Sequence, residues 1–182
     1  MEFFGKHRLV PHPEKGPKAV KSVEVDVVRA TNTILLMFRV EPAETLLLPA
    51  HGRERRDNLW RQTCFELFVK PESHGYVEYN FAPLSAWNAY SFADWRMGRR
   101  AYQPEAEPSI VDSRTDGRRE SFPGSYELDV VISPDILAFA PATLSLTAVI
   151  EEDQGPISYW ALAHPPGDPN FHHPDCFVAR LP

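Results

Sequence analysis

The strongest constraint on the fold is a pair of short segments in which apolar and polar side chains alternate. Residues 64–70 and 76–81 are separated by Pro-Glu-Ser-His-Gly, which places turn-forming residues where a hairpin turn needs them. Successive side chains of a strand point to opposite faces of the sheet, so a period of two indicates a strand with one buried face. We therefore expect a β-hairpin over residues 64–81.

The alternation assigns each side chain of this hairpin to one of two faces. One face is apolar and consists of Phe65, Leu67, Val69, Val77, Tyr79 and Phe81. If that face packs on the core, Glu66, Glu78 and Asn80 gather on the opposite face. The strand expected at residues 86–92 adds either Trp87 with Ala89 or Asn88 with Tyr90 to that second face, depending on its register.

Further strands are expected because β-branched and large apolar residues recur in short runs bounded by turn residues. These runs are 22–29, 33–41, 86–92, 109–113, 125–133, 143–151, 157–163 and 176–181. Ser133, Pro134 and Asp135 predict one short helix, with serine as the N-cap and proline at the first helical position. Residues 1–19 lack these patterns and are expected to form an irregular arm.

The chain contains 18 prolines in 182 residues, about twice the usual share. Proline removes a backbone donor and is confined to loops and strand ends, which favours a loop-rich β protein. About ten strands with one short helix predict an antiparallel two-sheet β-sandwich of jelly-roll type. The length predicts a single domain over residues 1–182. Trp95 and Trp160 are expected to pack in its core, because large aromatic residues dominate cores.

Charge and composition argue against several classes of partner. The net charge of -6 and the pI near 5.6 argue against nucleic-acid binding, which depends on a basic face. Arginine clusters at 53–61, 96–100 and 114–119 are interpreted as solvated loops. No run approaches the ~20 apolar residues of a membrane span, and the N-terminus lacks the apolar segment of a secretion signal. We therefore expect no membrane partner and a cytoplasmic location, and the oligomeric state stays open.

The polar face of the hairpin suits recognition of a small polar ring compound. Carboxylates and an amide can form hydrogen bonds with ring hydroxyls, while an aromatic plane covers the apolar face of the ring. The alternative is an ordinary exposed polar sheet face, which antiparallel sheets commonly have.

Three blocks of sequence carry a resemblance to a known family. They are LWRQTCFELFV, GYVEYNFAPLSAWNAYSFADWRMG and YWALAHPPGDPNFHHPDCF. Together they resemble the DOMON-like group that is related to family 9 carbohydrate-binding modules, over residues 20–181. The resemblance implies a two-sheet antiparallel sandwich that binds sugars in the modules and haem or other small ligands in some relatives.

The resemblance also implies where a ligand binds. In the sugar-binding branch a tryptophan precedes a glutamate by six positions, and a polar pair spaced by two follows on the next strand. Trp60 with Glu66, then Glu78 with Asn80, match that spacing, and residues 171–173 occupy the region where the branch has a second aromatic residue. The candidate ligand-binding residues are therefore Trp60, Arg61, Glu66, Glu78, Asn80, Trp87, Phe171, His172 and His173.

The main expectation is a non-catalytic binding domain without a cofactor, and two alternatives stay open. The first is a hydrolase that uses Glu66 and Glu78, since glycosidases use two carboxyl groups about 5–10 Å apart, or a metal bound by histidines in residues 164–175. Adjacent His172 and His173 point opposite ways on an extended chain, which disfavours a shared ion. The second alternative is a haem-binding domain, which needs axial ligands such as methionine and histidine. Met37 and Met97 form no recognisable pair with a histidine.

Cysteine usage gives no support to a metal or disulfide framework. Cys64 and Cys176 are too few for a set of disulfides or for a thiolate metal site. The sequence also contains no nucleophile-elbow or phosphate-loop motif.

Overall fold

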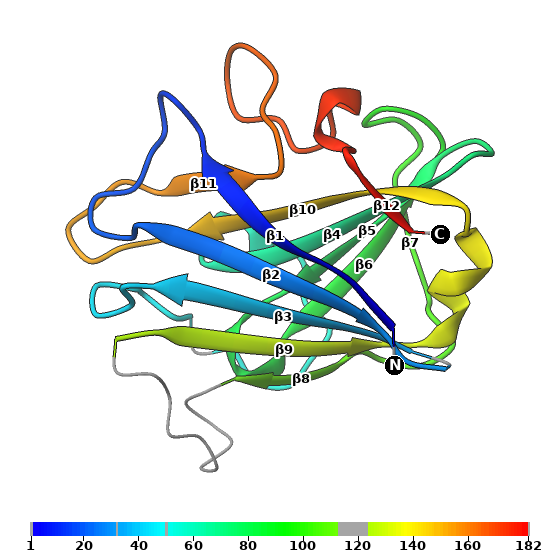
Figure 1. The fold of residues 1–182 in the computed structure, drawn as a ribbon, viewed down its shortest axis with the longest axis horizontal. Coiled ribbons are helices and arrows are strands. Elements are labelled where there is room, and N and C mark those ends of the chain that lie inside the picture. The colour runs from blue at the N-terminus through cyan, green and yellow to red at the C-terminus, as the bar shows by residue number, and fades with distance from the viewer. Residues whose placement is uncertain (1, 32, 50, 113–123, 182) are drawn as a thin grey trace.

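The computed structural model describes residues 2–31, 33–49, 51–112 and 124–181. These residues form twelve antiparallel strands (Figure 1). The strands are β1 (Glu2–Pro11), β2 (Ser22–Arg29), β3 (Ile34–Glu41), β4 (Cys64–Pro71), β5 (Tyr76–Phe81), β6 (Trp87–Phe92), β7 (Arg100–Ala101), β8 (Ser109–Asp112), β9 (Tyr126–Ile132), β10 (Ala142–Ile150), β11 (Ser158–Ala161) and β12 (Ala179–Leu181). The runs expected from the sequence are therefore confirmed as strands, with boundaries that differ by a few residues.

All twelve strands belong to one curled sheet, which forms a half-barrel. The strand order along the curl is β7-β6-β5-β4-β10-β11-β1-β2-β3-β9-β8, and β12 pairs with β10 beside this path. In Figure 1, β2, β3, β9 and β8 form the near half, and β4, β5 and β6 lie behind them. The expected antiparallel all-β architecture is confirmed, but the expectation of two separate sheets is wrong.

Strand β1 joins the two halves of the sheet. It pairs with β2 as far as Leu9 and with β11 at Val10 and Pro11. Residues 1–19 were expected to be an irregular arm, and that expectation is wrong for Glu2–Pro11, which form β1. Gly5, where the register shifts, and the basic residues after it hide the strand pattern. Pairing on both sides of β1 outweighs this weak local preference.

The helical segments are short 3-10 turns. They are η1 (Leu59–Arg61), η2 (Pro83–Ser85), η3 (Pro134–Phe139) and η4 (Pro174–Cys176). The helix expected after Ser133 is η3, which ends before Pro141 as proline geometry requires. Within the described ranges, no helix has the length and apolar character needed to cross a membrane.

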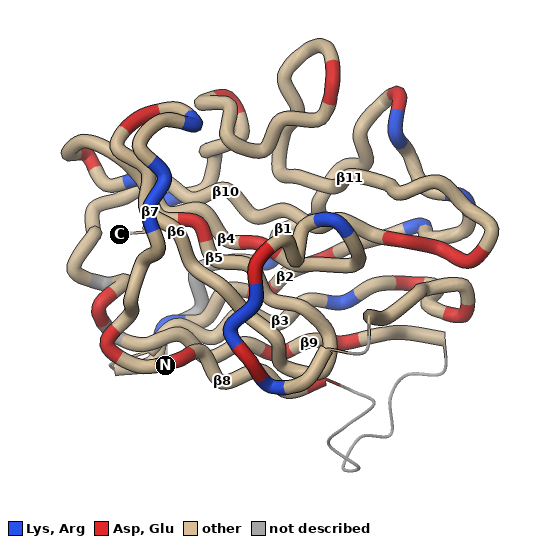
Figure 2. Tube along the Cα trace, turned by 180° about the vertical axis from the view of Figure 1, so that it is seen from behind, with Lys and Arg blue, Asp and Glu red and all other residues tan. Residues whose placement is uncertain are grey.

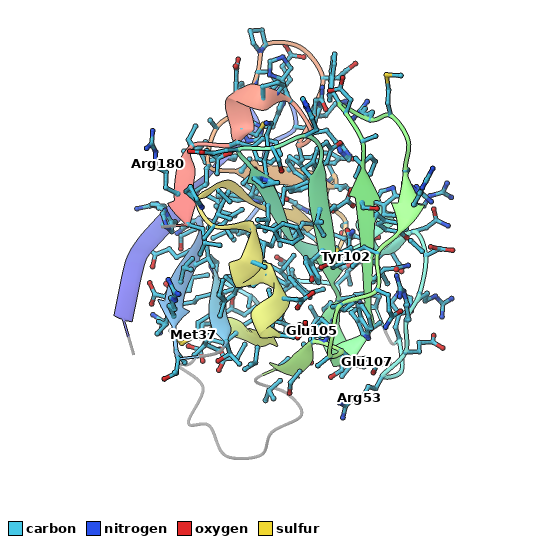
Figure 3. The ribbon with its side chains drawn as sticks, turned by 90° about the vertical axis from the view of Figure 1, so that its right-hand side faces the viewer. Met37, Arg53, Tyr102, Glu105, Glu107 and Arg180 are labelled. Carbon is cyan, nitrogen blue, oxygen red and sulfur yellow. The ribbon has the colours of Figure 1, made fainter. Side chains whose placement is uncertain are left out.

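The core fills the space inside the curl. Alternate residues of β2, β3 and β9 meet those of β4 and β5, and the ring centroids of Phe38 and Phe65 lie 5.0 Å apart across it. Side chains from both halves occupy this interior (Figure 3). Trp160 is buried there as expected, whereas Trp95 is 49% exposed on a loop, so its expected core position is wrong.

A second apolar cluster covers the other face of β4, β5 and β6. It combines Phe68, Tyr76, Tyr90 and Phe92 with Phe171 of the C-terminal segment. Because residues 64–69 and 76–81 are all buried, this face is not the exposed polar surface that the sequence left open as an alternative. The hairpin is therefore enclosed on both sides.

Charged residues are interspersed along the described chain. In Figure 2, short segments of lysine or arginine (blue) and of aspartate or glutamate (red) are scattered over strands and loops. Asp116 and Gly117, expected to form a turn, and the arginine cluster at 114–119 lie outside the described residues.

Candidate functional site

A cavity of about 390 Å³ lies on the face of β4 and β5 that points away from the core. Its volume is in the lower part of the range of about 300–1,000 Å³ that is usual for small-ligand pockets. The lining residues are Trp60, Glu66, Phe68, Glu78, Phe92, Arg96, Arg99, Val149, Tyr159, Pro169, Phe171 and His172. Strands supply the floor, while η1, the β6–β7 loop and the C-terminal segment supply the walls.

The register of the β4–β5 hairpin brings the two glutamates together. Glu66 lies opposite Asn80, and Phe68 lies opposite Glu78, so all four side chains share one face. This confirms the expectation that both glutamates lie on neighbouring antiparallel strands, opposite the apolar face that packs in the core. Glu66 is 2% and Glu78 is 5% exposed. Two carboxyl groups are therefore buried at the bottom of one cavity.

Each carboxyl group has a hydrogen-bond donor from a neighbouring strand or residue. Thr147 Oγ1 donates to Glu66 Oε2 at 2.8 Å, and Thr147 is the residue of β10 that pairs with Glu66. Asn80 Nδ2 donates to Glu78 Oε1 at 2.6 Å. Buried carboxyl groups need such partners, since an unsatisfied one costs considerable free energy.

Burial raises the pKa of both carboxyl groups, and the other groups that influence the pKa differ between them. For Glu66, burial and the negative charge of Glu78 raise the pKa, and the Thr147 hydrogen bond opposes them weakly. For Glu78, burial raises the pKa, while the Asn80 hydrogen bond and the charges of Arg99 and Arg96 oppose it. Glu66 therefore holds its proton to higher pH and can donate a hydrogen bond, and Glu78 is the better acceptor.

A hydrogen-bonded chain orients His172 in the cavity wall. The backbone N–H of Arg96 donates to Tyr76 Oη at 3.1 Å, and Tyr76 Oη lies 2.7 Å from His172 Nδ1. We assign the Tyr76 O–H as the donor to Nδ1, because Nδ1 is the one acceptor among the described residues that lies within hydrogen-bond distance of this hydroxyl. The imidazole proton then sits on Nε2, which faces Glu78 Oε2 at 3.7 Å.

The contact between His172 and Glu78 is not an ion pair. Burial, with the nearby charges of Arg96 and Arg99, lowers the pKa of His172 to about 4, so the ring is neutral at pH 7. The distance of 3.7 Å is also too long for a direct hydrogen bond. The Nε2–H group is therefore available to a ligand.

Two arginines at the cavity were not among the residues predicted from the sequence. Arg96 and Arg99 lie on the loop between β6 and β7, whose arginine cluster was interpreted as solvated. The Arg99 guanidinium lies 4.5 Å from the ring centroid of Tyr90 and 5.6 Å from that of Trp60. A usable signal was Gly98, which marks a tight turn within the loop that follows β6.

The structure brings five of the nine predicted residues to the cavity lining: Trp60, Glu66, Glu78, Phe171 and His172. Asn80 lies behind the cavity, where it holds Glu78. The C-terminal segment and η1 thus lie at the same site, as the resemblance implied.

Three predicted residues lie elsewhere. Trp87 is packed in the core because it pairs with Phe81, with Arg55 5.0 Å from its ring, so the register selects Asn88 and Tyr90 for the site face. His173 does not line the cavity, and its Nδ1 accepts the backbone N–H of Asp175 at η4. Arg61 is exposed and does not line the cavity.

The metal and haem alternatives find no support in the site geometry. Over the part of the chain that the structure describes, no three His, Cys, Asp or Glu side chains group as metal ligands. Met37 lies on β3, in the other half of the sheet, between core residues Leu36 and Phe38, so it points outward there (Figure 3). Met97 is 65% exposed on the β6–β7 loop.

Comparison with known proteins gives fold similarity only. No family model matches the chain, and no curated protein matches it. The structure is similar to that of a candidate carbohydrate-binding protein from Bacteroides uniformis ATCC 8492, with a TM-score of 0.65, 16% identity, and coverage of 96% of this chain and 84% of that chain. At this identity the similarity establishes a shared fold.

Two further structures align less well. They are of a family 9 carbohydrate-binding module from Caldicellulosiruptor kristjanssonii, in complex with glucose and with cellotriose. Both have a TM-score of 0.47, with 10% and 9% identity. The alignments cover 80% of this chain and 69% of that chain for the glucose complex, and 83% and 72% for the cellotriose complex. At this score no common architecture follows.

Proposed function

We propose that this chain is a non-catalytic domain that binds a small saccharide in the cavity between η1, the β4–β5 hairpin and the C-terminal segment. The observation that carries the proposal is one cavity in which Glu66 and Glu78 form the floor and Trp60 and Phe171 contribute aromatic walls. Sugars present hydroxyl groups at their edges and C–H groups on their faces, so they need both kinds of contact.

The polar groups of the cavity offer complementary hydrogen-bonding roles. Glu78 accepts from a hydroxyl, protonated Glu66 donates or accepts, and the His172 Nε2–H donates. Hydrogen bonds to a charged group contribute roughly 1.5–3 kcal/mol each. These groups are held by neighbouring residues before a ligand arrives, which limits the entropy lost on binding.

Fold similarity to the candidate carbohydrate-binding protein from B. uniformis supports this proposal. The proposal includes a relationship with the sugar-binding branch of the DOMON-like group rather than with its haem-binding members. The matching positions of Trp60, Glu66 and Glu78, now seen around one cavity, support that assignment.

One observation favours a second function, glycoside hydrolysis. Two carboxyl groups with raised pKa values, buried on the floor of one cavity, can serve as a general acid and its partner. Release of nitrophenol from aryl glycosides over hours, abolished by Glu66→Gln and by Glu78→Gln, would establish this function in place of simple binding.

Calorimetric titration with a panel of neutral and acidic mono- and disaccharides tests the binding proposal. At least one sugar is expected to bind, and Glu78→Gln is expected to weaken its binding at least about tenfold, because the amide replaces one of the two acceptor oxygens with an NH₂ donor. Glu72→Gln, on the exposed turn of the same hairpin, is the matched control and leaves the affinity unchanged. Binding that is insensitive to Glu78→Gln would place the ligand elsewhere and overturn the proposal.

A further inference from the structure

The backbone of the β6–β7 loop, which carries the two arginines, is closed by hydrogen bonds. These run from Ala93 N–H to Met97 O at 3.0 Å and from Met97 N–H to Asp94 O at 2.9 Å. Gly98 has a φ of 66°, and a Cβ there would lie 2.9 Å from Ala93 Cβ, so the turn requires glycine. The Arg96 N–H bond to Tyr76 ties the loop to the cavity wall.

The two guanidinium groups have no acidic partner among the described residues. No described carboxylate lies within 4.0 Å of Arg96 or Arg99, and neither side chain donates a hydrogen bond to a described acceptor. Arg55 differs, because its nitrogens donate to Asn88, Gln103, Ala89 and Tyr102. The donors of Arg96 and Arg99 therefore remain available at the cavity mouth.

Arg99 is nevertheless held in place without an ion pair to any described residue. Its guanidinium lies within cation–π range of both Tyr90 and Trp60, which orients the side chain while leaving its N–H groups available. Asp57, the carboxylate beside Tyr90, already accepts hydrogen bonds from Tyr90 Oη at 2.6 Å and from Asn88 at 2.9 Å.

The cavity also contains little negative charge to balance these arginines. Glu66 retains its proton more readily than Glu78, and His172 is neutral, so Glu78 is the main acidic group that faces both arginines. Asp94, on the same loop, accepts the backbone N–H of Trp95 at 2.7 Å. Two positive charges, of which that of Arg99 is oriented by Tyr90 and Trp60, therefore border a cavity whose principal acidic group is Glu78.

We infer that the natural ligand is an acidic saccharide, such as a sugar with a uronic acid group, whose carboxylate is bound by Arg96 and Arg99. This inference rests on the proposed saccharide-binding function and adds the charge of the ligand. A guanidinium group matches a carboxylate with two parallel N–H···O bonds, and such charge-assisted bonds are stronger than neutral ones. The glutamates then bind the hydroxyl groups at the other side of the ring.

The test compares D-glucuronate with D-glucose and D-galacturonate with D-galactose, because each pair differs only at C6. At low salt, titration calorimetry is expected to show at least about tenfold tighter binding of one uronate than of its neutral parent. Higher salt is expected to reduce the ratio of the uronate affinity to the affinity for the neutral parent, since the arginines lie at the exposed mouth of the cavity.

Arginine variants test which side chains cause the preference for the uronate. Arg99→Gln and Arg96→Gln are each expected to reduce the uronate affinity at least about tenfold, with a much smaller effect on the neutral sugar. Arg100→Gln is the matched control, because Arg100 is exposed on the same hairpin, pairs with Ser91 and does not line the cavity. The melting temperature of each variant confirms that it is folded.

Three results would contradict the inference, and they differ in what else they contradict. A neutral sugar that binds as tightly as its uronate overturns the acidic ligand and leaves saccharide binding intact. Cyclohexanecarboxylate that binds as tightly as the uronate shows an anion site without sugar recognition, which overturns both proposals. Absence of binding by every compound of the panel also overturns both.

Discussion

The hydroxyl group of Tyr76 lies 2.7 Å from Nδ1 of His172, and the same oxygen accepts the backbone N–H of Arg96. One phenol thus connects the strand floor, the C-terminal wall and the arginine loop of the cavity. The proton arrangement around it determines whether Nε2 of His172 donates or accepts a hydrogen bond in the cavity.

The first prediction concerns the state of His172. Because its pKa is lowered to about 4, the ring stays neutral from about pH 5 upward, with its proton on Nε2. Nitrogen-15 NMR of the imidazole is expected to show this tautomer. A Tyr76→Phe variant removes the donor to Nδ1 and costs about 0.5–1.5 kcal/mol of stability. A ring that titrates near pH 6.5 in the native protein would contradict the arrangement.

The second prediction concerns the cost of burying Glu66. Its pKa is raised in the folded state, so the unfolded state loses its proton first as pH rises above about 4.5. Stability therefore falls from about pH 4.5 upward until the folded pKa is passed, by about 1.4 kcal/mol for each pH unit between the two pKa values. Glu66→Gln, which can still accept from Thr147, is expected to raise the denaturation midpoint at about pH 8 and to change it little at about pH 4.

Glu72→Gln is the control for that series, because Glu72 is exposed on the turn of the same hairpin. Chemical denaturation at several pH values measures the difference. Equal effects of Glu66→Gln at the acidic and the basic end of the series would show that the pKa of Glu66 is not raised.

The third prediction concerns the different roles of Trp60 and Trp160. Trp60 lies partly buried at the cavity, whereas Trp160 is 1% exposed in the core. Trp160→Ala is expected to cost about 3–5 kcal/mol of stability. Trp60→Ala is expected to cost much less stability but to weaken saccharide binding strongly, since it removes an aromatic wall. A Trp60→Ala protein that fails to fold would refute the role of Trp60 as a binding platform.

The fourth prediction concerns Glu152, a buried carboxylate remote from the pair in the cavity. It accepts backbone N–H bonds from Lys18, Ala19 and Val20 and a hydroxyl bond from Thr45. Burial raises its pKa, but these hydrogen bonds outweigh burial and lower it overall. The resulting stability is present above about pH 4.5 and is lost as pH falls through the lowered folded pKa.

Glu152→Gln is therefore expected to destabilise the protein at neutral pH by about 1–3 kcal/mol, because its amide group turns a donor towards backbone donors. The difference from the native protein is expected to shrink on acidification, in the opposite sense to Glu66→Gln. Glu151→Gln, at the neighbouring partly exposed position, is the control. The measurement is the denaturation midpoint of the native protein and of Glu152→Gln at about pH 7 and about pH 3. The same difference between the two proteins at both pH values would contradict the prediction.

The sequence predicts the hairpin well because its signal is local. A strict period of two in residues 64–69 and 76–81 determines which side chains share a face, and the tertiary structure only adds what covers them. The choice between Trp87 and Asn88 could not be made from the pattern, because each face of residues 86–92 carries both an aromatic and a polar residue. Pairing of Phe81 with Trp87 decides it.

The parts that the sequence does not predict depend on contacts between distant segments. Strand β1 is held by β2 and β11 rather than by its own residue preferences. Arg96 and Arg99 lie in an irregular loop without periodicity, and their position at the cavity follows from the path of the tight turn at Gly98. The two halves join through β1, which no local pattern of residues 1–11 indicates.

Because the β4–β5 hairpin is enclosed on both sides, its residues are less free to change in evolution than the segments that border the cavity. In residues 64–69 and 76–81, odd-numbered positions face the core, even-numbered positions face the other apolar clusters and the cavity, and all twelve side chains are buried. Substitutions in the strands therefore disturb either packing or the cavity floor. The β6–β7 loop and the C-terminal segment border the same cavity outside the central strands, so a new ligand preference is most readily acquired, or engineered, by exchanging those two segments while the floor is kept.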